Sequence, residues 1–249
     1  LISGVLLSPI AILNRKKFPK KQLKWLFLAA FAGNFIPMFL FPIAETKVSS
    51  SIAGIMNSMM PIFTIIVGAL FWKTKTTSRQ ILGILISFSG VVLLMISGEK
   101  SAETPIFYVG LLLFAAFLYA VSVTTVGAKL THIPAKMMSS FVFFYVLFLP
   151  SLISLYFSNF FNEFTFTNEN MIGLGFVATL SVLGTGLAMI LHYRLMSVSN
   201  PLFASTVTLL MPVVAVMWGV IDGESFTFLQ ALGAVIIFAG LIFLRKKKA

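Results

Sequence analysis

Residues 80–94 have the sequence QILGILISFSGVVLL, and residues 230–244 repeat it as QALGAVIIFAGLIFL. At a constant offset of 150 residues, seven positions are identical: Gln80/Gln230, Leu82/Leu232, Gly83/Gly233, Ile86/Ile236, Phe88/Phe238, Gly90/Gly240 and Leu94/Leu244. Similarity at a fixed offset indicates a duplicated architecture. We therefore expect two repeats, the first over residues 1–98 and the second over residues 104–249. The glycines, seven residues apart in each copy, are predicted to allow close helix packing.

The composition is that of an integral membrane protein. Hydrophobic residues make up 59% of the chain and charged residues 10%, against roughly 25% charged residues in soluble domains. Eight stretches of 19 or more residues contain no Lys, Arg, Asp or Glu, namely 25–44, 48–72, 80–98, 104–128, 137–162, 170–193, 195–221 and 225–244. Each is long enough to cross a hydrocarbon core about 30 Å thick. The predicted fold class is all-α, with eight complete membrane spans.

The opening run, LISGVLLSPIAIL at residues 1–13, is apolar but too short to span the membrane. Its segment VLLSP at residues 5–9 resembles VLFLP at residues 146–150. By this alignment the run is part of the second helix of the first repeat, and a counterpart of the span at 104–128 is missing. We expect ten helices in the complete pattern, five in each repeat, with this chain starting inside the second.

Basic residues occupy every second loop between the spans. Sixteen of the 18 Lys and Arg residues fall in the segments 15–24, 73–79, 129–136, 194 and 245–248, and the seven acids lie at or beside the opposite loops. Because Lys and Arg concentrate in cytoplasmic loops, these loops and the C-terminus are predicted to be cytoplasmic, in a multi-pass protein of the cell (inner) membrane. Topology and anionic lipid headgroups explain the net charge of +11, and no nucleic-acid partner is expected.

The two repeats are predicted to be inverted relative to each other. An offset of 151 residues places Pro61 on Pro212 and Gly33 on Gly184. Equivalent helices are separated by five spans, an odd number, so they must cross the membrane in opposite directions. The charges agree, because the loop after the first proline helix is KTKTTSR and the loop after the second contains Asp-Gly-Glu.

These features resemble the EamA-type transporters of the drug/metabolite transporter superfamily: a proline within one span of each half, an acidic loop at residues 222–224 and a final helix of the form Q-x-L-G-x(6)-G. The first repeat departs from that pattern at Lys73 and Lys75, where the family often has Glu, and in lacking its first helix. The resemblance implies a secondary transporter that exports a small metabolite, amino acid or drug-like solute by alternating access. Nucleotide-sugar carriers are similar in architecture, and such a cargo is one alternative.

The two prolines are predicted to break their helices and to mark the substrate site. A proline in a helix leaves the carbonyl four residues earlier unpaired, here the carbonyls of Asn57 and Thr208. Such a group is costly in lipid but tolerated against protein or a water-filled cavity. We therefore expect Asn57 and Thr208 to contact substrate and replacement of either by Leu to abolish transport. The alternative is that Pro61 and Pro212 produce kinks that only shape helix packing.

Three further polar residues lie within the predicted spans. Asn34 is near the centre of the span at 25–44, and its counterpart at the 151 offset is Thr185. Tyr119 shares one face of its span with Ala115 and Ser122. Polar side chains are costly in hydrocarbon, so we expect Asn34, Tyr119 and Thr185 to line the substrate site. Hydrogen bonding between helices is the alternative for Asn34.

Energy coupling is less defined by the sequence, because proton-driven carriers commonly keep an acid inside the membrane and every acid here lies at a span boundary. Glu45 is the deepest acid and His192 the other candidate for coupling or gating. For His192 we favour an interfacial position beside Tyr193 and Arg194. Passive exchange is a further alternative.

No enzymatic activity is expected. The chain has no Cys, two His residues, no HExxH, no GxSxG and no phosphate-binding loop, so neither a metal site nor a cofactor is predicted. The expected partners are a small-molecule substrate and the lipid bilayer. The rival class is a non-transporting membrane scaffold or subunit, which has no need of an inverted repeat. Oligomeric state is left open, with a homodimer as one alternative.

Overall fold

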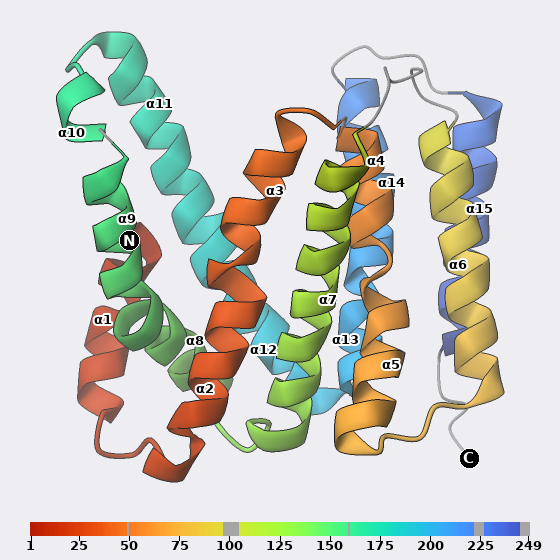
Figure 1. The fold of residues 1–249 in the computed structure, drawn as a ribbon, viewed down its shortest axis with the longest axis horizontal. Helices are drawn as coiled ribbons and strands as arrows, with labels where there is room; N and C mark the ends of the chain where they lie inside the picture. Colours follow the sequence, from red (N-terminus) through yellow and green to blue (C-terminus); the bar gives the residue numbers. More distant parts are fainter. Residues whose placement is uncertain (49, 97–104, 159, 222–226, 245–249) are drawn as a thin grey trace. The chain divides into compact units, whose positions relative to one another are not determined.

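The computed structural model describes residues 1–48, 50–96, 105–158, 160–221 and 227–244, and these residues form helices without any β-strand (Figure 1). Helices occupy all eight predicted spans, although the span ends at residues 97–98, 104 and 225–226 lie outside the described residues. Within the described chain, five helical segments are long and apolar enough to cross a membrane: Lys20–Glu45, Ile52–Trp72, Ile106–Lys129, Ala135–Phe157 and Asn168–Val198. The predicted all-α membrane fold class is confirmed.

The chain forms two compact units. Unit 1 comprises Leu1–Phe31 and Thr125–Ser199, and unit 2 comprises Ala32–Thr124 and Asn200–Ala249. Each unit therefore contains segments from both halves of the sequence. The units are sets of residues in contact, whereas the predicted repeats at 1–98 and 104–249 are defined by sequence similarity.

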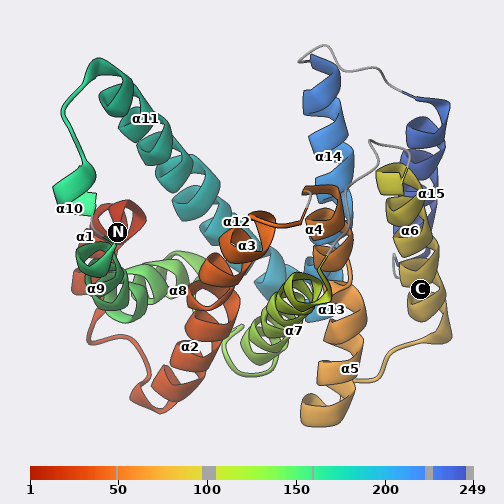
Figure 2. The same cartoon turned by 45° about the horizontal axis from the view of Figure 1, so that its top comes forward.

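Unit 1 is built around α1 (Ile2–Asn14), which packs against α8, η3 and η4. Gly4 makes the contact with η3 close, because a Cβ there would lie 2.9 Å from the carbonyl oxygen of Phe143. The Ser3 hydroxyl donates a hydrogen bond of 2.6 Å to the Ser181 carbonyl. The other elements, shown in Figure 2, are η1 (Lys20–Gln22), α2 (Leu23–Ala30), α8 (Ala135–Phe141), η3 (Val142–Leu147), α9 (Phe148–Phe157), α10 (Phe160–Glu163), α11 (Asn168–Thr179), η4 (Leu180–Leu187) and α12 (Ala188–Val198).

Unit 2 has two apolar cores. One joins Val91, Leu94, Leu209, Val213 and Ile237, and the other joins Ala44, Val48, Ala53 and Leu112. Its elements are most of η2 (Phe31–Phe35), then α3 (Pro37–Glu45), α4 (Ser50–Asn57), α5 (Met60–Trp72), α6 (Ser78–Ile96), α7 (Ile106–Lys129) as far as Thr124, α13 (Pro201–Ser205), α14 (Val207–Ile221) and α15 (Phe228–Leu244).

The duplicated helices α6 and α15 lie side by side in unit 2 (Figures 1 and 2). A Cβ on Gly90 would lie 2.7 Å from the Gly233 carbonyl oxygen, and a Cβ on Gly240 would lie 2.5 Å from that of Gly83. The predicted role of these glycines in close packing is confirmed. The pairing is crossed. Gly90 faces Gly233, which is the counterpart of Gly83, and Gly240 faces Gly83.

Ser87 lies between the two glycine contacts and is fully buried. Its hydroxyl donates a hydrogen bond of 3.1 Å to the carbonyl oxygen of Ile237. Ile237 is the residue that aligns with Ser87 at the 150 offset. Ser87 thus contacts its own counterpart, and the crossed glycine contacts lie on either side of it. This pattern is expected for two antiparallel helices that are related by a local two-fold axis.

The identical glutamines at the start of the two helices form matching capping boxes. The Gln80 Oε1 accepts from the Thr77 backbone N–H at 3.0 Å, and the Thr77 hydroxyl accepts from the Gln80 N–H at 3.3 Å. Thr227 and Gln230 exchange the same two bonds at 2.9 and 3.2 Å. This arrangement satisfies backbone donors that a helix start leaves unpaired, which explains why Gln is identical in both copies.

Candidate substrate-binding site

The helix that contains Pro61 is interrupted directly before the proline. α4 ends at Asn57, Ser58 and Met59 form a turn, and Pro61 lies in the first turn of α5. A proline is tolerated there because the N–H that it lacks would have no partner within the helix. The interruption leaves the Asn57 side chain at the end of α4.

Pro212 lies in a different local setting, inside α14. In this copy the interruption falls at Thr206, six residues before the proline, where α13 ends. The short α13 begins with Pro201 and is capped by Asn200, whose Oδ1 accepts from the Phe203 N–H at 2.8 Å. Both predicted repeats thus contain a broken helix, but the breaks fall at residues that are not counterparts.

The Asn57 amide has most of its hydrogen-bonding capacity unused. Its Nδ2 donates to the sulfur of Met211 at 3.5 Å, and its Oδ1 is buried without a hydrogen-bond partner. A thioether is a weak acceptor, and Met211 is 55% exposed, so its side chain can move. Buried polar atoms are nearly always hydrogen-bonded, and each exception calls for an explanation. A substrate that donates to Oδ1 would supply the missing partner.

The hydroxyl groups near this break differ from the amide because they are already bonded within their own helices. Ser58 donates to the Gly54 carbonyl at 2.8 Å, Thr64 to the Met60 carbonyl at 2.8 Å, and Thr208 to the Ser205 carbonyl at 2.9 Å. A hydroxyl whose hydrogen is used in this way can still accept a bond from a ligand but cannot donate one. Thr208 is therefore available only as an acceptor.

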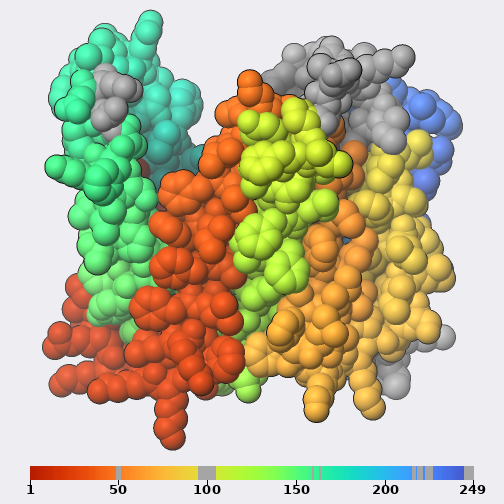
Figure 3. All heavy atoms as spheres, viewed as in Figure 1, coloured from red at the N-terminus to blue at the C-terminus, as the bar shows by residue number. Residues whose placement is uncertain are grey.

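A second group of predicted residues lies where η2 and α3 pack on α7. The Tyr119 ring stacks on Phe41, with centroids 5.9 Å apart, and Gly33 lies against Ser122. Asn34 follows Gly33 in the π-helical segment η2, and its Nδ2 is buried without a hydrogen-bond partner. On the face of unit 2 shown in Figure 3, α7 lies between α3 and α5, and Phe117 of α7 packs edge-on against Phe63 of α5. Asn34 thus offers an unpaired donor, whereas Asn57 offers an unpaired acceptor.

The contact between Gly33 and Ser122 yields a stability prediction. A Cβ at position 33 would overlap the Ser122 hydroxyl and lie 2.6 Å from its Cβ. Gly33→Ala should therefore destabilise the protein by about 1–3 kcal/mol, as overpacked interiors do, and Ser122→Gly should restore much of the loss. Thermal unfolding of the two single variants and the double variant in detergent measures the coupling. Additive losses in the double variant would contradict the contact.

The remaining predicted residues belong to other elements. Thr185 belongs to unit 1, in the π-helical segment η4, and its neighbour Gly186 packs near Ser3. His192 is half-buried in α12 of unit 1, with its ring 6.3 Å from that of Tyr193. Glu45 is the exposed last residue of α3. Of the five predicted substrate residues, Asn34, Asn57, Tyr119 and Thr208 belong to unit 2, and only Asn57 and Thr208 lie near one crossing, that of α4 with α14.

Two residues in contact with the predicted site were missed from the sequence. The sulfur of Met211 accepts a hydrogen bond from the Asn57 amide, and the ring of Phe41 stacks on that of Tyr119. A signal for Met211 was present, since Met60 and Met211 both precede the duplicated prolines. Nothing comparable marks Phe41 among the 27 phenylalanines of the chain. In the described part of the chain, His, Asp and Glu form no group of three that could hold a metal ion.

Comparison with known proteins agrees with this architecture. The chain is 26% identical over 250 residues to the uncharacterized transporter YetK of Bacillus subtilis, covering 97% of this chain and 74% of the relative. It is 28% identical over 260 residues to the uncharacterized transporter YdfC of the same organism, covering 98% and 78%. A protein of known crystal structure has the same fold, with a TM-score of 0.74 over 97% of this chain and 83% of that chain, at 15% identity.

Family membership follows from both halves of the chain. The EamA-like transporter family matches residues 1–96 and again residues 106–246. These two matches leave out only the connection between the halves and the C-terminal residues. The protein is a multi-pass membrane transporter and belongs to the EamA-like transporter family.

Proposed function

We propose that the protein is a secondary transporter that exports a small metabolite, amino acid or drug-like solute across the cytoplasmic membrane by alternating access. The observation that carries this proposal is the Asn57 amide, whose oxygen is buried and unpaired beside a helix interruption. Broken helices in carriers commonly present such groups to a substrate. Within unit 2, Asn57 makes the main polar contact, and Asn34, Tyr119 and Thr208 are the other residues that we assign to the lining.

The reciprocal packing of α6 and α15 supports the inverted repeat on which alternating access depends. Ser87 bonds its own counterpart, Ile237, and the glycine contacts are crossed around that point. Two helices that run in the same direction could not make these contacts in register. Inverted repeats give a carrier two related conformations, one open to each side of the membrane.

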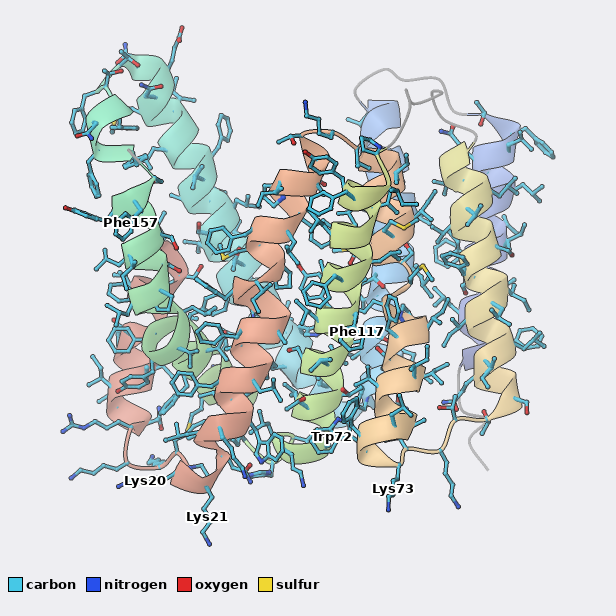
Figure 4. The ribbon with its side chains drawn as sticks, viewed as in Figure 1. Lys20, Lys21, Trp72, Lys73, Phe117 and Phe157 are labelled. Atoms are coloured by element: carbon cyan, nitrogen blue, oxygen red, sulfur yellow. The ribbon has the colours of Figure 1, made fainter. Side chains whose placement is uncertain are left out.

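The charge distribution supports a cytoplasmic C-terminus. The long span formed by α4 and α5 ends at Trp72. Lys73 follows directly and projects away from the helix (Figure 4). Lys75 follows in the connection and Arg79 in the first turn of α6, and both are exposed. By the positive-inside rule this connection faces the cytoplasm, as does the basic tail at residues 245–248, which lies outside the described residues.

Transport into proteoliposomes tests the proposal. Purified protein is reconstituted and loaded with a panel of unlabelled amino acids, metabolites and drug-like amines, and counterflow of each labelled compound is measured. We expect saturable counterflow of at least one neutral compound. No Lys or Arg lies in any of the eight spans, so a nucleotide sugar, with its charged diphosphate, should not be exchanged. Absence of counterflow across a broad panel would favour a scaffold.

The same vesicles test the two coupling candidates. If Glu45 carries the coupling proton, Glu45→Gln should remove the dependence of transport on a pH gradient while leaving counterflow intact. His192→Gln makes the same test for the histidine. Transport that keeps its pH dependence in both variants would exclude both residues and favour passive exchange.

A further inference from the structure

One end of unit 1 carries a concentrated positive charge. We call it the basic cap and define it as Arg15, Lys16, Lys17, Lys20, Lys21, Lys24, Lys129 and Lys136. All eight side chains are exposed, and Figure 4 shows Lys20 and Lys21 projecting outward from η1, which directly precedes α2. The segments that supply the cap, residues 1–31 and 125–158, contain no Asp or Glu. These segments therefore supply no acid to the cap.

The acids of unit 1 lie far from the cap. Glu163 and Glu169 follow the continuous helical segment Ala135–Phe157, which is 23 residues long. At 1.5 Å per residue this segment separates them from Lys136 by roughly 35 Å. A charge at that distance is screened at physiological salt, where the Debye length is about 8 Å. Glu163 and Glu169 therefore do not neutralise the cap.

Two lysines of the cap converge on a single indole ring. The Lys24 ammonium is 5.0 Å from the centroid of Trp25, and the Lys129 ammonium is 5.7 Å from the same centroid. Lys24 belongs to α2 and Lys129 to the end of α7, so distant parts of the sequence build this group. Each ammonium has three N–H donors, and the two like charges held beside one ring favour an anion that bonds to both.

The backbone beneath the cap is held by buried side chains. Phe18, in the connection from α1 to α2, is 6% exposed and stacks on Phe141 with centroids 4.4 Å apart. Leu130 and Ile133, in the connection between α7 and α8, are also buried. Both connections are thus fixed to the helices, which presents the lysines in a defined arrangement.

We propose that the basic cap binds the headgroup of an anionic phospholipid, with its phosphate held by Lys24 and Lys129 at the edge of Trp25. Helix α1 ends at Asn14 and α2 begins at Leu23, so the connection between them carries most of the cap. This connection lies at headgroup depth when unit 1 is in a membrane. Trp is favoured at that depth, and basic residues there gain about 1 kcal/mol each from an anionic leaflet. The other six cap residues attract the lipid, and Lys24 and Lys129 bind its phosphate beside Trp25.

Lipid titration of the purified protein tests this site without reference to transport. In a Trp72→Phe/Trp218→Phe background, Trp25 is the only tryptophan. Phosphatidylglycerol brominated on its acyl chains should quench Trp25 fluorescence and raise the thermal unfolding midpoint, whereas brominated phosphatidylcholine should do so at least tenfold less effectively. The preference should weaken as salt rises above about 0.1 M, because the interaction is electrostatic.

Matched variants locate the site. Lys24→Gln/Lys129→Gln should weaken the response to phosphatidylglycerol about tenfold or more, and Lys73→Gln/Lys75→Gln, which removes two exposed lysines of unit 2, should leave it unchanged. Size-exclusion profiles check that each variant is folded, and inorganic phosphate at equal concentration should not reproduce the response. Equal responses to the two lipids, or wild-type affinity in Lys24→Gln/Lys129→Gln, would overturn the proposal, as would full replacement of the lipid by inorganic phosphate.

Discussion

Replacing Asn57 by leucine should reduce transport efficiency by about 10- to 100-fold or more while the protein folds normally. The substitution keeps a side chain of similar size and removes the amide whose Oδ1 is buried and unpaired. Loss of one hydrogen bond in a buried site costs roughly 1–3 kcal/mol, and each 1.4 kcal/mol is about tenfold in affinity. Leucine also removes the unpaired atom, so thermal stability should stay the same or rise. Counterflow in proteoliposomes and thermal unfolding in detergent measure the two effects.

Thr208→Val is the control for Asn57→Leu. The Thr208 hydroxyl already donates to the Ser205 carbonyl, so valine removes an acceptor and leaves the helix shape unchanged. We expect a loss of transport several times smaller than that of Asn57→Leu, although the predicted inverted repeat makes the two positions counterparts. Normal transport by Asn57→Leu would place the substrate site elsewhere. A larger loss in Thr208→Val would show that the threonine is the more important contact.

Gly90→Leu should prevent the protein from folding into a stable particle. Even the first carbon of a side chain at this position would lie 2.7 Å from the Gly233 carbonyl oxygen and 2.8 Å from the Ile237 nitrogen. These are backbone atoms in the facing helix, and they can yield only if α6 and α15 separate. Overpacking in a close-packed interior costs 1–3 kcal/mol or more, and leucine adds three further carbons. Size-exclusion chromatography after mild detergent extraction should show aggregated protein.

Alanine substitutions supply graded controls for this effect. Gly90→Ala should lower the thermal midpoint strongly because its Cβ meets the same backbone atoms. Gly110→Ala in α7 has no atom within 4 Å of the new Cβ and should be neutral or stabilising by up to about 1 kcal/mol, as alanine favours helix over glycine. If the two alanine variants unfold at the same temperature, the α6–α15 contact contributes little to stability.

The membrane spans and the role of the paired glycines in close packing could be predicted from sequence because both depend on local patterns, whereas the pairing of α6 with α15 came from the structure. Uninterrupted apolar stretches determine where helices cross a bilayer. The identical glycines marked the positions where the backbones meet. The capping role of Gln80 and Gln230 was also encoded locally, in the threonine three residues earlier, although only the structure drew attention to it.

The details of the candidate site were harder to predict because they depend on residues distant in sequence. Both prolines were expected to break their helices in the same way, yet the second break falls at Thr206, with Pro212 inside α14. Asn34 and Thr185 lie in π-helical segments, η2 and η4. A π turn adds one residue without changing the apolar pattern, so hydropathy does not predict it. The partner of Asn57, Met211, is 154 residues away.

The contact of Ser87 with Ile237 bears on how the two halves could come to differ. In an assembly of two separate, identical chains, a position on the two-fold axis must face its own residue type, so a small side chain meets a small one and a large meets a large. Here a serine meets an isoleucine, and the hydroxyl of one fits under the carbonyl of the other. Such a pairing requires two copies of different sequence, as the two halves of this chain are. The hydrogen bond therefore runs in one direction only, from α6 to α15, and distinguishes the two helices at the centre of their contact.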